Sequence, residues 1–300
     1  MDISIIIPFY KGNNYLERLL NSVELAIKKA NLNGIKVEVI LVNDSPEYNI
    51  IMPVHNRLAI NIIKHKQNLG IHQARITGLK RAVGKYVQFL DQDDELTVGS
   101  LVSNYNKVSN YDVIIGNGYF NFNQTIVRKI YSSVAYQKKA TQENPYLKVR
   151  DLIVSPGQCL VKKEAIPEYW VMNPMLSNGA DDYLLWLLMF DQKKKFGINP
   201  DLVYIHHDSG ENISFDFEIM KKSTNNLISM LEKNMDFPKQ KTKLVSRMLN
   251  YKHKLISQNK LQFFMASLQN MDLFIVNLFF RFRYSGAVIS NQEMRIKNEK

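Results

Sequence analysis

Residues 86–95 read YVQFLDQDDE, a largely apolar segment that runs directly into four carboxylates within five positions. Packing such like charges together is unfavourable unless water or a cation offsets them. A solvated acidic turn that ends a buried strand would explain this stretch, and so would a cation site at the end of that strand. The rest of the sequence has to separate these alternatives.

Short apolar segments alternate with helical patterns through the first 120 residues. Apolar residues recur at helical spacing from Asn14 onward and again from Ile71 to Ala82. The expected strands cover residues 3–7, 37–42, 60–63, 86–90 and 112–116. Because these strands are continuously apolar rather than alternating, they indicate an α/β fold with a mostly parallel central sheet flanked by helices.

Two acidic residues stand where expected strands end. Asp44 follows the strand at 37–42, and Asp91 follows the strand at 86–90. In open parallel sheets, ligands bind beyond the carboxyl ends of the strands. This placement favours a ligand or cation site over a solvated turn.

The composition fits a folded protein of 300 residues, with 45% hydrophobic and 22% charged residues. The single cysteine, Cys159, excludes an internal disulfide framework and a cysteine-based zinc site, and it fits a reducing compartment. The opening residues lack the basic region of a signal peptide, and no apolar run approaches the roughly 20 residues that span a bilayer. We therefore expect a cytoplasmic protein.

The excess positive charge is concentrated near the C-terminus. The net charge is +11, and residues 216–300 hold 15 Lys and Arg against 7 Asp and Glu. Helical patterns cover 217–234, 243–270 and 271–283, whereas 119–170 give little signal. We expect a catalytic domain over residues 1–215 and a basic helical extension over 216–300.

Three alternatives remain open for this basic extension. Its helices can simply pack on the catalytic domain with their charges in water. They can also bind an anionic membrane surface on the inner face of the cell membrane, since apolar residues 273–280 lie beside Arg281 and Arg283. The third alternative is nucleic acid, but no helix-turn-helix, zinc or RNA-recognition signature supports it, so we do not expect that partner.

Five segments, taken in order, resemble the family 2 glycosyltransferases of GT-A fold. The resemblance covers residues 1 to about 215 and implies transfer of a sugar, with inversion, from a nucleotide diphosphate donor to an acceptor hydroxyl. The matching segments are SIIIPFYKGNNYLERLLNSV (4–23), VEVILVNDSP (37–46), NLGIHQARITGLKRAVGKYVQFLDQDD (68–94), GADDYLLWLLMF (179–190) and YIHHDSGENIS (204–214).

The resemblance implies a nucleotide site, where Asp44 would accept a hydrogen bond from the base. Arg75 would contact base or phosphate, and its neighbour Thr77 stands where the family usually has Asn. A turn or cap role for Asp44 and a helix-surface pair for Arg75 remain the alternatives. The residues expected to bind the nucleotide are Pro8, Tyr10, Asp44, Arg75, Asp91 and Gln92.

Asp91 and Asp93 match the DxD pair, which implies a Mn²⁺ or Mg²⁺ cofactor bridging the carboxylates and the diphosphate. His207 matches a family histidine near the metal. Ile205 replaces the arginine that usually precedes it, so His207 is either a ligand or a polar loop residue.

The pair Asp181 and Asp182 begins an apolar helix, where a capping role is the alternative to catalysis. The resemblance implies that the second acid, Asp182, is the general base that deprotonates the acceptor, with Asp181 in place of the usual Glu. Gln158 lies where family members contact donor or acceptor.

These inferences point to a hexosyl- or N-acetylhexosaminyltransferase with a UDP-sugar donor. We expect the acceptor to be a lipid-linked or cell-surface polysaccharide intermediate, as in capsule or O-antigen assembly. The first strand is followed neither by the Gly-rich basic loop of a nucleotidyltransferase nor by the G-x-G-x-x-G of a dehydrogenase. A catalytically inactive binding module on membrane or nucleic acid remains the alternative function.

Overall fold

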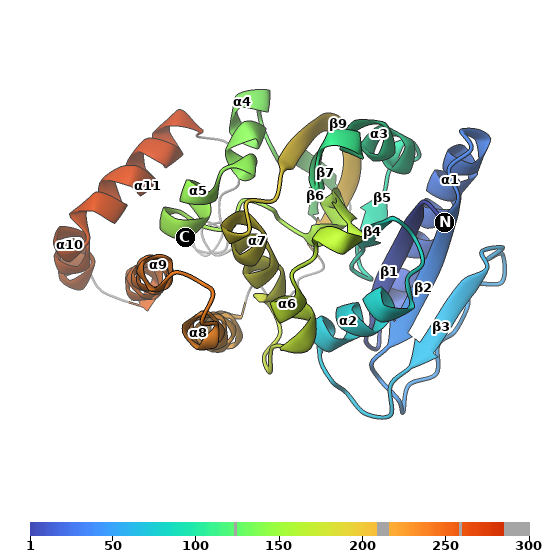
Figure 1. Cartoon of the computed structure of the whole chain (residues 1–300), viewed down its shortest axis with the longest axis horizontal. Helices are drawn as coiled ribbons and strands as arrows, with labels where there is room; N and C mark the ends of the chain where they lie inside the picture. Colours follow the sequence, from blue (N-terminus) through green and yellow to red (C-terminus); the bar gives the residue numbers. More distant parts are fainter. Residues whose placement is uncertain (123–124, 209–215, 258–259, 285–300) are drawn as a thin grey trace.

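The computed structural model describes residues 1–122, 125–208, 216–257 and 260–284. In these ranges one mixed sheet has the order β3-β2-β1-β4-β8-β6-β9-β5, with β7 paired to β6 (Figure 1). The strands are β1 Ile3–Phe9, β2 Val37–Asn43, β3 Ile60–Lys64, β4 Tyr86–Phe89, β5 Glu95–Leu96, β6 Val113–Phe122, β7 Thr125–Lys129, β8 Cys159–Lys162 and β9 Phe196–Asp208.

The first half of the sheet confirms the strand predictions. β1 pairs in parallel with both β2 and β4, and β2 pairs in parallel with β3. β6 and β9 form a long parallel pair, whereas β8, β5 and β7 join the sheet antiparallel. Parallel pairing therefore accounts for most of the sheet, and β1, β2 and β4 end at the same edge.

Helices flank this sheet and continue beyond it. The helices are α1 Asn13–Leu32, α2 Ile71–Arg81, α3 Ser100–Lys107, α4 Val134–Gln137, α5 Glu143–Lys148, α6 Glu168–Met172, α7 Asp181–Asp191, α8 Phe217–Lys233, α9 Lys239–Ser257, α10 Lys260–Gln269 and α11 Met271–Arg283. Short 3₁₀ turns cover Val108–Asn110, Lys138–Thr141, Pro156–Gln158 and Lys163–Ala165. The helix predicted over 243–270 is wrong in extent, because the structure divides that stretch between α9 and α10.

Helix α2 lies close against β1 because Gly78 has no side chain. A Cβ built at Gly78 would come within 2.3 Å of Ile6 Cγ2, closer than two carbon atoms can pack. The buried face of α2 also carries Arg75, one turn before Gly78. The close approach therefore fixes Arg75 over the carboxyl ends of β1 and β4.

Helices α8 to α11 lie together at one end of the molecule, opposite β1, β2 and β3 (Figure 1). Lys241 of α9 binds Glu143 of α5 and Asp191 at the end of α7, each at 2.7 Å. Asn277 of α11 donates to the Lys148 carbonyl at 3.1 Å. These contacts fix the helices on the rest of the chain, and the domain boundary at residue 215 stays a prediction.

Candidate active site

The ends of β1 and β4 are joined by a side-chain amide. Gln92 accepts from the Tyr10 backbone N–H at 2.8 Å and donates to the Tyr10 carbonyl at 3.1 Å. Pro8 is buried within β1, whereas the Tyr10 ring is exposed. Of these three predicted nucleotide residues, Tyr10 is therefore the most exposed, Gln92 is half-buried and Pro8 is buried.

Asp44 is buried at the end of β2 and organises the segment before α2. Its Oδ1 accepts from His65 Nδ1 and from Leu69 N, and its Oδ2 accepts from Gly70 N, each at 2.8 Å. His65 Nε2 in turn lies 2.9 Å from Thr77 Oγ1, so the Thr77 hydroxyl has a hydrogen-bond partner in His65. Since a carboxylate has about four acceptor positions, one position on Oδ2 is left for a ligand.

Arg75 lies between two groups of carboxylates that are distant in sequence. Its Nη2 donates to Asp91 Oδ1 and its Nη1 donates to Asp181 Oδ2, both at 2.6 Å. Burial opposes the charge of this guanidinium, but Asp181, Asp91 and Asp182 outweigh it and raise the pKa of Arg75. The predicted phosphate or base contact of Arg75 is therefore replaced, in this arrangement, by an ion pair that joins β4 to α7.

The two carboxylates of the DxD pair have different surroundings. Asp91 is held on both oxygens, because Ser155 Oγ donates to Oδ2 at 3.0 Å while Arg75 occupies Oδ1. Burial, with the nearby charges of Asp94 and Asp91, raises the pKa of Asp93 to about 7. Asp93 is therefore the carboxylate of the pair whose charge is least compensated by the protein.

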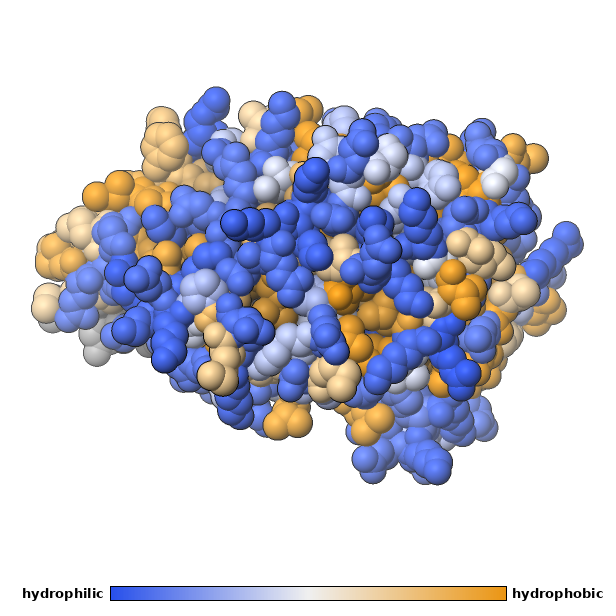
Figure 2. All heavy atoms as spheres, in the orientation of Figure 1, coloured by the Kyte–Doolittle hydropathy of each residue, from blue (hydrophilic) through white to orange (hydrophobic). Residues whose placement is uncertain are grey.

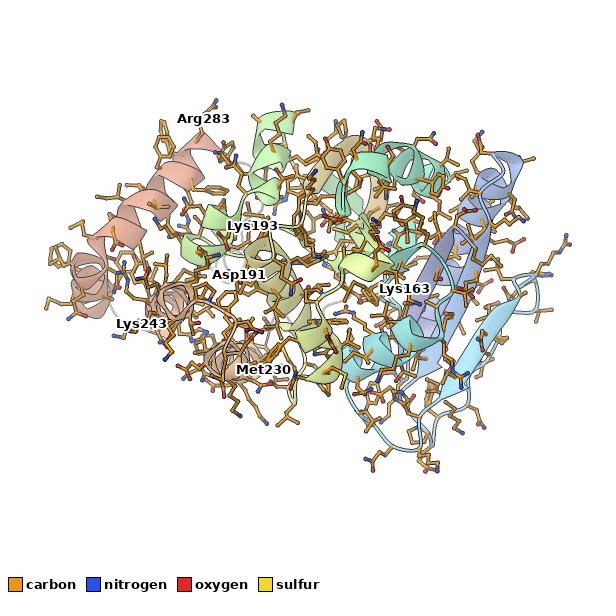
Figure 3. The ribbon with its side chains drawn as sticks, viewed as in Figure 1. Lys163, Asp191, Lys193, Met230, Lys243 and Arg283 are labelled. Atoms are coloured by element: carbon orange, nitrogen blue, oxygen red, sulfur yellow. The ribbon has the colours of Figure 1, made fainter. Side chains whose placement is uncertain are left out.

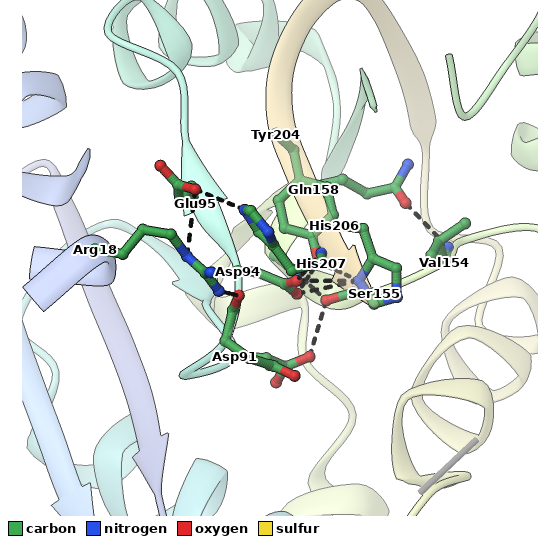
Figure 4. Close-up of polar contacts among 12 residues, drawn as sticks. Arg18, Asp91, Asp94, Glu95, Val154, Ser155, Gln158, Tyr204, His206 and His207 are labelled. Carbon is green, nitrogen blue, oxygen red and sulfur yellow. Dashed lines mark hydrogen bonds and ion pairs between the residues drawn. The ribbon is translucent and has the colours of Figure 1, made fainter. Parts of the chain in front are cut away.

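Asp94 is fully buried and attaches the acidic turn to β9 (Figure 4). Its oxygens accept from the Tyr204 hydroxyl and from the His207 backbone N–H, and His206 Nδ1 lies 3.1 Å from Oδ1. Burial works against a charged His206, but Asp94 and Asp93 outweigh it and raise its pKa to about 9. Asp94 thus has a positioning role, in which it holds the acidic turn against β9.

Arg18 of α1 is a site residue that the sequence analysis missed. Its Nη2 donates to the Asp93 carbonyl at 2.5 Å, and its Nε lies 3.4 Å from Glu95 Oε1. Glu95 Oε1 is also 2.6 Å from His207 Nε2 (Figure 4). His207, which was predicted to bind the metal, is therefore paired with the Glu95 carboxylate in this structure. In the sequence, this role is indicated only by the position of Arg18 near the start of the helix that follows the first strand.

Asp181 and Asp182 begin α7 beside this site. Asp181 is buried in its ion pair with Arg75, and its carbonyl accepts from Trp170 Nε1 at 2.8 Å. Asp182 Oδ1 accepts from the Tyr183 backbone N–H at 2.7 Å. Burial and the charge of Asp181 raise the pKa of Asp182 to about 7. The two acids therefore differ, since Asp181 is paired and Asp182 can exchange a proton near neutral pH.

Gln158 is completely buried, and its carboxamide is used within the fold. Nε2 donates to the Gly116 carbonyl at 3.0 Å, and Oε1 accepts from Val154 N at 2.9 Å (Figure 4). These bonds hold the loop that carries Ser155, which contacts Asp91. The predicted donor or acceptor contact of Gln158 has no free side-chain group to make it in this arrangement. The motif residues 209–214 lie outside the described residues.

No preformed cation cage is present among the described residues, because no three His, Cys, Asp or Glu side chains there converge to hold a metal ion. Two carboxylates and a histidine of the predicted metal set nonetheless lie in one region, at the ends of β4 and β9. Any cation here would need further oxygen ligands from a bound donor.

The sequence model of glycosyl transferase family 2 matches residues 4–170, more than half of the chain. The chain belongs to this family. TarP of Staphylococcus aureus, a poly(ribitol-phosphate) β-N-acetylglucosaminyltransferase, is 25% identical over 216 residues, which are 67% of this chain and 61% of TarP. Three other curated relatives are spanned for only 11% to 21% of their lengths.

Two solved structures show the same GT-A fold. TarS of S. aureus in complex with UDP-GlcNAc has a TM-score of 0.57 at 18% identity, over 93% of this chain and 80% of that chain. Mannosyltransferase PcManGT of Pyrobaculum calidifontis, in complex with GDP-Man and Mn²⁺, has a TM-score of 0.55 at 13% identity, over 99% and 79%. This family 2 chain therefore has the fold that the sequence predicted.

Proposed function

We propose that this family 2 chain transfers a sugar from a nucleotide diphosphate donor to an acceptor hydroxyl with inversion. The observation that carries the proposal is the bridge through Arg75, which brings Asp91 of the DxD pair beside the Asp181–Asp182 pair. The donor carboxylates and a candidate base thereby share one site. Sugar transfer requires the residues that bind the donor and the base that activates the acceptor to lie around the same anomeric carbon.

Asp182 is the proposed general base. Its raised pKa of about 7 suits proton transfer near neutral pH. In the proposed step, Asp182 takes the proton of the acceptor hydroxyl while that oxygen bonds to the anomeric carbon. The bond from this carbon to the diphosphate breaks on the opposite face, and its electron pair leaves with the diphosphate. Attack opposite the leaving group inverts the configuration.

Asp93 is the residue that best fits a divalent cation. Its carboxylate is a hard oxygen ligand. Burial and the charges of Asp94 and Asp91 raise its pKa to about 7, which means that its ionised form is disfavoured in the protein alone. A cation bound beside it would stabilise that ionised form. Asp91 is held by Arg75 and Ser155, and His207 by Glu95, so these two fit less well. A bound Mn²⁺ or Mg²⁺ would neutralise charge on the diphosphate.

A UDP-sugar is the proposed donor. The remaining acceptor position on Asp44 suits an imide N–H of a pyrimidine base, and TarS, which shares the fold, binds UDP-GlcNAc. For the acceptor, we propose a lipid-linked or cell-surface polysaccharide intermediate. TarP, whose name includes a poly(ribitol-phosphate) acceptor, is the relative that supports this class.

We further propose that α10 and α11 hold the chain on an anionic membrane. Figure 2 shows hydrophobic residues gathered at the end of the molecule where these helices lie. The exposed apolar residues are Phe263, Phe264, Met265, Leu268, Met271, Ile275, Leu278, Phe279 and Phe282. So large an exposed apolar surface, with Arg283 beside it at the end of α11 (Figure 3), suits an interfacial helix pair.

The described helices also bear on whether the chain could cross a bilayer. None of them alone has the length and apolar character of a membrane span. Phe263–Gln269 and Met271–Arg283 reach that character only together, and they meet at a 105° bend.

Release of nucleotide from a panel of donors tests the function. The chain is incubated with UDP-, GDP-, CDP- and dTDP-sugars in Mn²⁺ or in EDTA, and free nucleotide is measured over hours. We expect slow hydrolysis of a UDP-sugar that EDTA and Asp93→Ala both abolish. Binding of UDP without any turnover, even with cell-envelope glycan acceptors supplied, would instead favour an inactive binding module.

A further inference from the structure

Four basic residues from four separate segments meet between the sheet domain and the C-terminal helices. They are Arg128 of β7, Arg150 after α5, Lys252 of α9 and Arg281 of α11, named here the basic cluster. Arg150 is its centre. Burial and the charges of Arg150 and Arg281 lower the pKa of Lys252 to about 7, and burial with Arg150 also lowers the pKa of Arg128 and of Arg281.

A tyrosine hydroxyl and aromatic contacts hold this cluster together against its own repulsion. Arg150 Nη2 donates to the Tyr136 hydroxyl at 3.4 Å. The Tyr136 ring stacks on Tyr284 with centroids 5.1 Å apart and meets the edge of Phe280 at 5.8 Å. Since Phe280 precedes Arg281 in α11, these contacts bring α11 to Arg150. The fold therefore stabilises an arrangement that its charges oppose.

Little negative charge acts on Lys252 in the described part of the chain. Asp151 is the carboxylate whose charge acts on Lys252, and burial together with Asp182 raises the pKa of Asp151 well above its usual range. Arg128 Nε and Nη2 are buried, and no hydrogen-bond partner for them lies within the described residues. Buried donors without acceptors are costly, and a multidentate anion would satisfy them.

The position of the cluster relative to the proposed base indicates which anion. Asp151 interacts electrostatically with Asp182 and also with Arg150 and Lys252, so the base and the basic cluster both lie near this one carboxyl group. The donor diphosphate is expected at a different set of residues, where Arg75 joins Asp91 to Asp181. An anion at the basic cluster would therefore belong to the acceptor rather than to the donor.

We propose that the basic cluster of Arg128, Arg150, Lys252 and Arg281 binds a phosphate group of the acceptor and so holds the acceptor hydroxyl toward Asp182. This inference rests on the proposed transferase function and adds an acceptor class to it. The phosphate can belong to a lipid-linked diphosphate or to a phosphodiester of a polymer. Both offer the oxygen acceptors that Arg and Lys donors recognise.

Binding of two soluble probes tests the proposal in the full chain. The probes are a short-chain prenyl diphosphate linked to N-acetylglucosamine and a glycerol phosphate trimer, each titrated calorimetrically with saturating UDP present so that the donor site is filled. Lys252→Gln removes one cluster charge. Its matched control is Lys254→Gln, an exposed lysine on the opposite side of α9 that lines a separate groove of ≈ 670 Å³.

We expect at least one probe to bind and Lys252→Gln to weaken it by about tenfold, the loss of one charge-assisted hydrogen bond. Lys254→Gln should leave the affinity unchanged, and UDP affinity should be the same in all variants. The melting temperature of Lys252→Gln should not fall, because the substitution removes a repelled charge. Arg281→Gln on α11 removes a second cluster charge and should weaken probe binding in the same way.

The outcomes separate the two phosphate sources and the two proposals. Binding of only the prenyl diphosphate supports a lipid-linked acceptor, and binding of only the glycerol phosphate trimer supports a polymer. The proposal is overturned when neither probe binds, or when Lys252→Gln and Lys254→Gln weaken binding equally. Probe binding without UDP binding would leave the basic site standing while the donor half of the proposed function fails.

Discussion

Arg75 and Asp181 form a buried ion pair of 2.6 Å although 106 positions separate them in the chain. The same guanidinium binds Asp91, so one cation holds the end of β4 and the start of α7 together. Without this cation, the buried Asp181 and the half-buried Asp91 would repel each other with no positive charge between them. We therefore assign Arg75 a positioning role, in which it sets the separation of the donor and base carboxylates.

Removing this cation is expected to destabilise the fold as well as the site. Arg75→Gln should lower the free energy of unfolding by about 3–5 kcal/mol, the usual cost of breaking a buried ion pair. Urea denaturation measures it. Arg81→Gln, an exposed change in the same helix, should stay within about 0.5 kcal/mol of the parent. Equal stabilities of the two variants would contradict the positioning role.

The two acids at the start of α7 should separate into a base and a structural partner. Asp182→Asn is expected to reduce the transfer rate by about 10²–10⁴, the usual contribution of a general base, without changing UDP affinity or unfolding. Asp181→Asn should instead lower stability, since it leaves Arg75 with one partner. Transfer rates and urea midpoints of both variants decide the assignment, which fails if Asp182→Asn keeps full activity.

The transfer rate should depend on pH through Asp182. Only the ionised carboxylate can take a proton, and its pKa is raised to about 7, so the rate should fall as pH drops below that value and level off above it. The profile of kcat/KM between about pH 5.5 and 9 measures this. An acidic limb that persists unchanged in Asp182→Glu, whose carboxyl sits differently, would assign the titration to another group.

The apolar face of α10 and α11 should control membrane attachment. Replacing Phe279 and Phe282 by Ser is expected to weaken binding to anionic phospholipid vesicles by tenfold or more, because burial of one such ring contributes about 1.5–3 kcal/mol. Vesicle sedimentation measures it, with Leu176→Ser as a control at an exposed apolar residue elsewhere. Vesicle binding that is absent in the parent, or equal in both variants, would contradict membrane attachment.

Much of the N-terminal fold could be predicted because its strands are continuously apolar and end in turn residues. β9 could not, since Pro200 and Asp201 interrupt its pattern and its partners β6 and β5 are distant in sequence. The division between α9 and α10 was also missed, because the polar residues 257–260 include neither the Gly nor the Pro that usually marks a helix break.

The candidate site was predictable in part for the same reason. Strand ends placed Asp44 and Asp91 at one edge, but local sequence carries no sign that Arg75 reaches Asp181 or that Asp94 holds His206. These contacts join segments about a hundred residues apart. They depend on how the elements pack rather than on any motif.

The central claim is that a nucleotide diphosphate binds beside Asp93 together with a divalent cation. Calorimetric titration of UDP into the full chain, in Mn²⁺ and in EDTA, tests this most directly. We expect saturable binding in Mn²⁺ that EDTA or Asp93→Asn weakens by about tenfold or more, since even residues outside the coordination sphere contribute that much to metal affinity. Absence of UDP binding in Mn²⁺, or equal affinity in Asp93→Asn, would contradict it.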